Sequence, residues 1–99
     1  MVTLFSYAGA TVPAVPEISR FHGIVIRMFH REHPPPHLHA QFGGYEITVE
    51  IGTGAEHGRF PVHALGRVRK WVELHREELL DCWRLARDEK PIPSIPPSE

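Results

Sequence analysis

The stretch HLHAQFGGYEITVEI, residues 37–51, decides the fold. Polar and apolar residues alternate on both sides of Gly43-Gly44, and a glycine pair between two alternating runs predicts a β-hairpin with a type I′ turn. If the two glycines form the turn, position 42 pairs with 45, and the pairs continue outward to 37 with 50. A shift of one residue would bury the glutamates, so the alternation fixes the register. One face then holds Leu38, Ala40, Phe42, Tyr45, Ile47 and Val49, and the other holds His37, His39, Gln41, Glu46, Thr48 and Glu50.

The segments on either side of this hairpin predict further strands. FHGIVIRMFHR, residues 21–31, is rich in β-branched and aromatic residues and is expected to form one strand. Its likelier core set is Ile24, Ile26 and Met28, which places Arg27 on the polar face if this strand neighbours the hairpin, as consecutive strands usually do. The prolines of EHPPP end the strand because they lack the N–H that pairing requires. After the turn GTGAEHG (52–58), a short fourth strand is expected to end near residue 60.

From Pro61 onward the apolar residues recur at helical spacing, up to about Arg87. One unbroken helix would measure about 39 Å, whereas a seven-residue strand measures about 23 Å. This mismatch favours a helix that is kinked or split in two near residue 75. The fold class that we expect is α+β: a three- to four-stranded antiparallel sheet with the C-terminal helical structure packed on one face.

Length and composition indicate one small soluble domain. We divide the 99 residues into an N-terminal extension (1–17) without regular structure beyond a short edge strand, a single α+β domain (18–88) and a Pro-rich flexible tail (89–99). The net charge of −1 gives no overall attraction to nucleic acid or membranes. A single cysteine, Cys82, excludes an internal disulfide, and we interpret it as a buried hydrophobe. No signal peptide or apolar run of membrane-spanning length is apparent, so a cytoplasmic location is expected.

The polar face suggests acid–base chemistry. A histidine paired across the strands with a glutamate, together with a second histidine and an arginine, is a set that can cleave RNA through its own 2′-hydroxyl group without a metal. In this hypothesis His37 and His39 are the acid and base, Glu50 orients His37, and Arg27 contacts the phosphate. The protein would then be a metal-independent ribonuclease.

Two other interpretations of the same face stay open. His37 and His39 are two residues apart on one strand and can share a divalent ion such as zinc, with Glu50 or His30 as a third ligand. His33 is harder to recruit, because a polyproline segment would carry it about 12 Å from His37. In the third interpretation the face has no catalytic role and is an ordinary solvated surface. Such a face could dock a protein partner or DNA in a non-catalytic subunit. A homo-oligomer is also compatible with this sequence.

The chain also resembles a known family. The pattern IxRFxGIxIxMxxxxHxPPHxHAxxxxY from Ile18 to Tyr45, followed by WVELHREELLDCWRLA, is similar to a family of small bacterial proteins of unknown function, catalogued as a DUF. The family pattern starts near Ile18, so residues 1–16 are an extension. The resemblance implies a component of a toxin–antitoxin-type pair, either a toxin-like ribonuclease or a subunit that binds a small cognate protein. It marks His33, His37 and His39 as signature positions.

Overall fold

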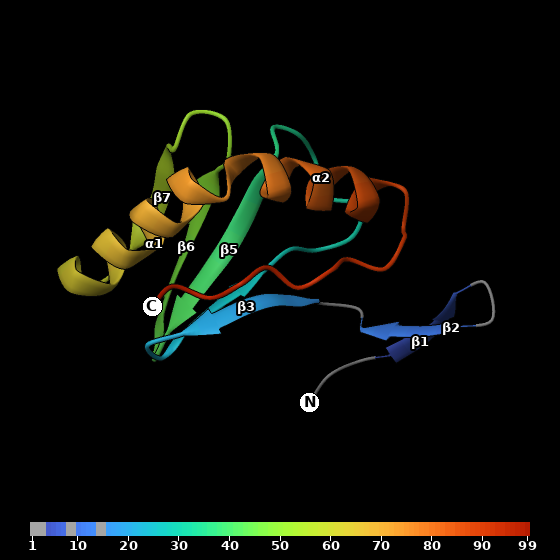
Figure 1. The fold of residues 1–99 in the computed structure, drawn as a ribbon, viewed down its shortest axis with the longest axis horizontal. Helices are drawn as coiled ribbons and strands as arrows, with labels where there is room; N and C mark the ends of the chain where they lie inside the picture. The colour runs from blue at the N-terminus through green and yellow to red at the C-terminus, as the bar shows by residue number, and fades with distance from the viewer. Residues whose placement is uncertain (1–3, 8–9, 14–15) are drawn as a thin grey trace.

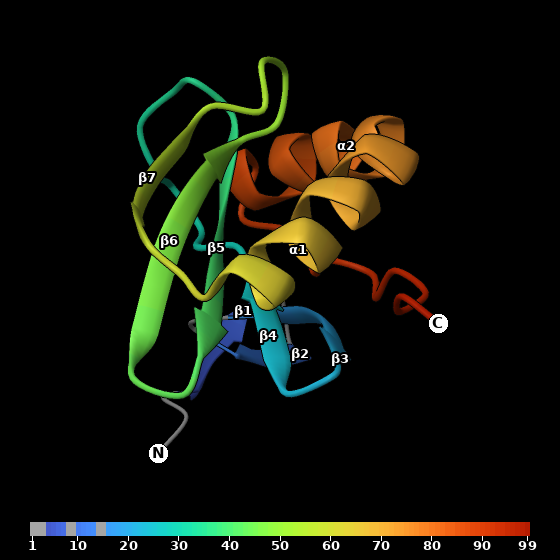
Figure 2. The same cartoon turned by 90° about the vertical axis from the view of Figure 1, so that its left-hand side faces the viewer.

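The structure is a computed structural model that describes residues 4–7, 10–13 and 16–99. Its main sheet has five antiparallel strands in the order β3-β4-β5-β6-β7, so each strand pairs with its neighbours in the sequence (Figure 1). Helices α1 and α2 follow the last strand and lie on the same side of the sheet (Figure 2). The α+β class is therefore confirmed, with one strand more than the upper number expected.

The central hairpin has the register that the sequence predicts. Strand β5 (His37–Phe42) pairs with β6 (Tyr45–Glu50) from Phe42 opposite Tyr45 to His37 opposite Glu50. The turn differs from the prediction, because only the first of its two glycines, Gly43, has a positive φ, 58°. A positive φ at the first central residue alone is typical of a type II′ turn, which suits the twist of a hairpin equally well.

The prediction of one strand over residues 21–31 is wrong. That region contributes the end of β3 (Glu17–Phe21) and all of β4 (Ile24–Arg27), and the two strands form a hairpin. The turn residues His22 and Gly23 have φ values of 50° and 79°, as a type I′ turn requires. Histidine is one of the few side chains enriched in this left-handed region, so His-Gly was the missed turn signal. Strand β4 pairs with β5 as expected, with Arg27 opposite His39.

The remaining strands are β7, at one edge of the main sheet, and two N-terminal strands that form a sheet of their own. Strand β7 (Glu56–Arg59) pairs with β6 and supplies the expected short strand after the second turn. Near the N-terminus, β1 (Leu4–Tyr7) and β2 (Ala10–Pro13) form a separate two-stranded sheet, where the sequence predicted a short edge strand at most. The rest of the expected extension, residues 1–3, 8–9 and 14–15, lies outside the described residues.

The predicted helical segment is split at His75. Helix α1 (Val62–Leu74) ends there, and α2 (Arg76–Arg87) begins one residue later, because His75 has φ −111° and ψ 21°. Its imidazole donates a hydrogen bond from Nδ1 to the Glu78 carboxylate and packs on Trp71. The apolar sides of both helices cover the sheet, with Trp71 and Trp83 buried in the core. Within the described part of the chain, no helix is long and apolar enough to cross a membrane.

Residues 89–99, expected to form a flexible tail, pack against the core in the structure. The tail runs back between α2 and β3 (Figure 1), and Ile95 is only 4% exposed. The backbone N–H of Ile95 donates to the Ile18 carbonyl, and the indole N–H of Trp71 donates to the Pro96 carbonyl at 2.9 Å. A buried indole needs such an acceptor, and the tail supplies it.

Gly58 gives a first test of the sheet geometry. Its φ is +117°, and a Cβ atom at this position would lie 2.6 Å from the Glu46 carbonyl oxygen. We expect Gly58→Ala to destabilise the protein by about 1–3 kcal/mol, measured by urea unfolding. The control is Gly66→Ala in α1, where a Cβ meets open space and should stabilise the helix by up to about 1 kcal/mol. Equal stability of the two variants would contradict the positive φ and the close backbone approach at Gly58.

Ile95 tests the packing of the tail. Truncating this buried side chain in Ile95→Ala should cost about 2–5 kcal/mol of unfolding free energy, as for other core isoleucines. The neighbouring Ser94 is exposed, so Ser94→Ala should leave the urea midpoint unchanged. A wild-type midpoint for Ile95→Ala would show that the tail is free in solution.

Candidate functional site

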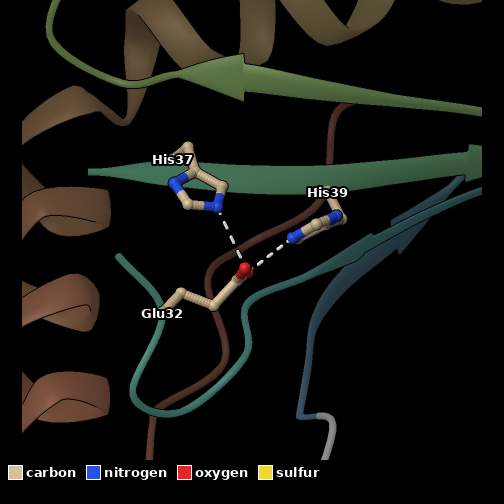
Figure 3. A group of neighbouring side chains, drawn as sticks. All are labelled: Glu32, His37 and His39. Carbon is tan, nitrogen blue, oxygen red and sulfur yellow. Dashed lines mark hydrogen bonds and ion pairs between the residues drawn. The ribbon is translucent and has the colours of Figure 1, made fainter. Parts of the chain in front are cut away.

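Three side chains converge at the start of β5. His37 and His39 project to the same side of this strand, and Glu32 reaches them from the loop of residues 28–36 (Figure 3). The Nε2 atom of His39 lies 2.6 Å from Oε1 of Glu32, and the Nε2 atom of His37 lies 3.2 Å from the same oxygen. One ligand atom from each residue thus falls within 4.8 Å of the other two.

The loop that carries Glu32 is held at the C-terminal end of α2. Met28 at its start is fully buried. The backbone N–H of Arg31 donates to the Ala86 carbonyl, and the guanidinium of Arg31 pairs with Glu89 at 2.6 Å. These contacts fold the loop over one end of the polar face, which the sequence had predicted to be open.

This loop partly buries the cluster of Glu32, His37 and His39. The side chains of His37 and His39 are 16% and 13% exposed, whereas that of Glu46, farther along the same face, is 53% exposed. Aromatic rings flank both imidazoles: His39 meets Phe29 edge-on at 4.4 Å between centroids, and His37 lies 5.2 Å from Trp83 of α2. The cluster is therefore a partly desolvated pocket with fixed ring orientations.

The hydrogen bonds constrain where the protons of His37 lie. Its Nδ1 atom is 2.8 Å from the Pro35 carbonyl oxygen, which can only accept, so Nδ1 carries a proton and donates it. Its Nε2 atom then faces Glu32, and an ionised carboxylate also only accepts. A neutral His37 would aim a lone pair at that carboxylate. The arrangement is satisfied only by a proton or another cation between the imidazoles and Glu32.

Arg27 lies beside this cluster, as predicted. It is opposite His39 on one side and opposite Glu17 on the other. Hydrogen bonds from Arg20 lower the pKa of the Glu17 carboxyl, and the charge of Arg27 lowers it further. The Nε atom of Arg27 is buried and has no hydrogen-bond partner among the described residues. This enclosed donor belongs to a residue that lies opposite His39 in the sheet.

Glu50 does not make the contact expected of it. It is opposite His37 in the sheet, but its carboxylate lies 3.0 Å from Nε2 of His57 and 3.5 Å from the Thr53 hydroxyl. The role of orienting His37 falls instead to Glu32 and the Pro35 carbonyl.

The other predicted residues of the face surround the cluster. Gln41 donates to Glu46 across the hairpin at 2.7 Å, and Glu46 also lies 3.9 Å from Nδ1 of His39. His33 lies with His37 at a hollow of ≈ 220 Å³. The side of the hollow formed by β6 and β7 is lined by Thr48, Glu50 and His57.

Sequence reasoning missed Glu32 and His57. Glu32 lies in an aperiodic loop, so no strand or helix pattern predicts its direction. It is, however, the only carboxylate between Glu17 and Glu46, and this was the available signal. His57 was missed because β7 is short and its register was not worked out; the structure places it opposite Thr48.

Comparison with known proteins identifies a family without an assigned activity. A family model described as a domain of unknown function, DUF4160, matches residues 23–84, from the β3–β4 turn into α2. This range includes Arg27, Glu32, His37, His39 and Glu50. No curated protein and no solved structure matches the chain. Because the match covers more than half of the 99 residues, the chain belongs to the DUF4160 family.

Proposed function

We propose that this protein binds a divalent transition-metal ion through Glu32, His37 and His39 and uses it to polarise a substrate. The observation that carries the proposal is the convergence of two imidazole Nε2 atoms on one carboxylate oxygen. Ligating histidines almost always donate their other ring N–H to a carbonyl, a carboxylate or water. His37 already makes that bond, with the Pro35 carbonyl.

The donor set suits zinc and its neighbours in the first transition row. Two imidazoles and one carboxylate are the protein ligands of several catalytic zinc sites and of the facial triad that binds iron(II). Bonds of about 2.0–2.2 Å to a shared ion would hold the ligand atoms roughly 3–3.5 Å apart. The distances of 2.6 and 3.2 Å to the Glu32 oxygen need only a small adjustment. With three protein ligands, at least one position is left for water or substrate.

A second candidate is the metal-independent ribonuclease that the sequence suggested, as the cytoplasmic RNA-cleaving component of a toxin–antitoxin-type pair. It is favoured by the position of Arg27 opposite His39 in the sheet, because a guanidinium group suits a phosphate. In this version a proton takes the place of the metal, and Glu32 rather than Glu50 stabilises the His37 imidazolium. The metal content of the protein separates the two candidates.

The metal test uses tag-free protein and elemental mass spectrometry after dialysis against trace zinc, manganese or nickel. We expect close to one ion per chain for the wild type. Removing a direct ligand in Glu32→Ala or His37→Ala should weaken binding more than the roughly 10–100-fold lost with an outer contact.

The matched control is Glu50→Ala, because Glu50 was the ligand expected from sequence and faces His57 instead. This variant should retain the ion. A wild type that carries no ion at any of the three metals would rule out the proposal and favour the metal-free candidate.

The tautomer of His37 can be tested without a metal. In chelator-treated protein at a pH where the ring is neutral, we expect the proton on Nδ1, because the Pro35 carbonyl accepts from that atom. Nitrogen-15 NMR of the imidazole ring distinguishes the tautomers, and exposed His63 on α1 provides the comparison. A neutral His37 protonated on Nε2 would contradict the ligand-ready orientation.

A further inference from the structure

We propose that His57, oriented by Glu50, is the general base of this site and that the substrate is RNA, cleaved through its own 2′-hydroxyl group. This inference rests on the proposed metal site, which would hold the phosphate. It adds a catalytic residue, His57, and a positioning residue, Glu50, that lie on the opposite side of the hollow from His37.

The first argument is the shape of the surface. The hollow of ≈ 220 Å³ has residues 33–35 and His37 on one side, and Thr48, Glu50 and His57 on the other. His37 is thus shared between the hollow and the metal cluster. A substrate oxygen bound to an ion beside His37 would lie at the edge of this hollow, with His57 across from it.

The register of the sheet gives the scale of this separation. Thr48 is opposite His39 in one direction and opposite His57 in the other, so the two histidines belong to one row across three strands. Two strand spacings amount to about 9.5 Å between their backbones. With both side chains on one face, a phosphodiester group with its neighbouring ribose fits between the metal cluster and His57.

The hydrogen bonds of His57 suit a base. The Glu50 carboxylate, 3.0 Å from Nε2, only accepts, so a neutral His57 carries its proton on Nε2 and has a lone pair on Nδ1. Glu50 is itself held by the Thr53 hydroxyl, which also accepts the Ala55 N–H. A carboxylate that fixes the tautomer of a catalytic histidine is the arrangement found in hydrolase triads. The His57 side chain is 65% exposed, so a substrate can reach it.

The chemistry at this pair points to RNA. The Nδ1 atom of His57 takes the proton of a 2′-hydroxyl group, O2′ forms a bond to phosphorus, and the bond from phosphorus to O5′ breaks. O5′ takes a proton from solvent and His57 releases its proton to solvent, so the products are a 2′,3′-cyclic phosphate and a 5′-hydroxyl end, and no water is consumed. An ion held by Glu32, His37 and His39 would neutralise charge on the non-bridging oxygens.

The experiment uses the full chain loaded with manganese or zinc and a DNA oligonucleotide that contains a single ribonucleotide. We expect cleavage only on the 3′ side of the ribose, with a cyclic phosphate product, and no cleavage of the all-DNA strand. His57→Ala should lower the rate by about 10²–10⁴-fold, the usual contribution of a general base, without changing metal content. Free imidazole should restore part of that loss, which a merely structural residue would not allow. Glu50→Gln should also lower the rate, and Glu50→Asp should recover part of it.

The matched control is His63→Ala, since His63 is an exposed histidine of α1 outside this hollow. It should cleave at the wild-type rate. If the wild type binds no metal, the proposed function fails and this inference fails with it. If metal binds but the ribonucleotide strand stays intact, or His57→Ala cleaves normally, the metal site stands and the role of His57 is overturned. Equal cleavage of the all-DNA strand would overturn the 2′-hydroxyl mechanism.

Discussion

The register of the β5–β6 hairpin is the constraint on which the rest of the structure depends. Because side chains alternate along a strand, this register places Leu38 and Ala40 in the core and their neighbours His37 and His39 on the opposite face. A slip by one residue would expose the core and bury both imidazoles under the helices. The packing of the helices and the formation of the site are therefore fixed by the same pairing.

Stability alone does not account for the cluster of Glu32, His37 and His39. A buried pair between a carboxylate and a histidine loses about as much in desolvation as it gains in attraction. Phe29 and Trp83 beside the rings exclude water and strengthen both effects. Apolar residues at these positions would pack at least as well against the same neighbours. The polar cluster is better explained by a ligand that it binds.

Sequence reasoning succeeded where the apolar residues recur at the regular spacing of a strand or a helix. The alternation of residues 37–51 gave the register, and helical spacing gave the extent of the helical region from residue 61 to Arg87. It failed in the loop of residues 28–36, where the apolar residues have no regular spacing. The direction of Glu32 depends on a loop whose path is set by contacts with Ala86 and Glu89, more than 50 positions away in the sequence. Such long-range contacts leave no local pattern, so Glu50 was the natural but incorrect partner for His37.

The same physical argument connects the two candidate functions. The Pro35 carbonyl fixes one proton of His37, and the remaining lone pair faces a carboxylate, so the site needs a positive charge between its three groups. A proton supplies that charge on one imidazole and leaves the other group to act as a base. A divalent ion supplies more charge and engages all three groups at once. A neutral His39 can donate from Nε2 to Glu32, because its Nδ1 has no hydrogen-bond partner among the described residues. One added proton on His37 therefore satisfies both contacts, and a divalent ion would engage the same three groups. The proposal of a metal therefore rests on the donor set, two imidazoles and one carboxylate with ligand atoms within 4.8 Å of one another.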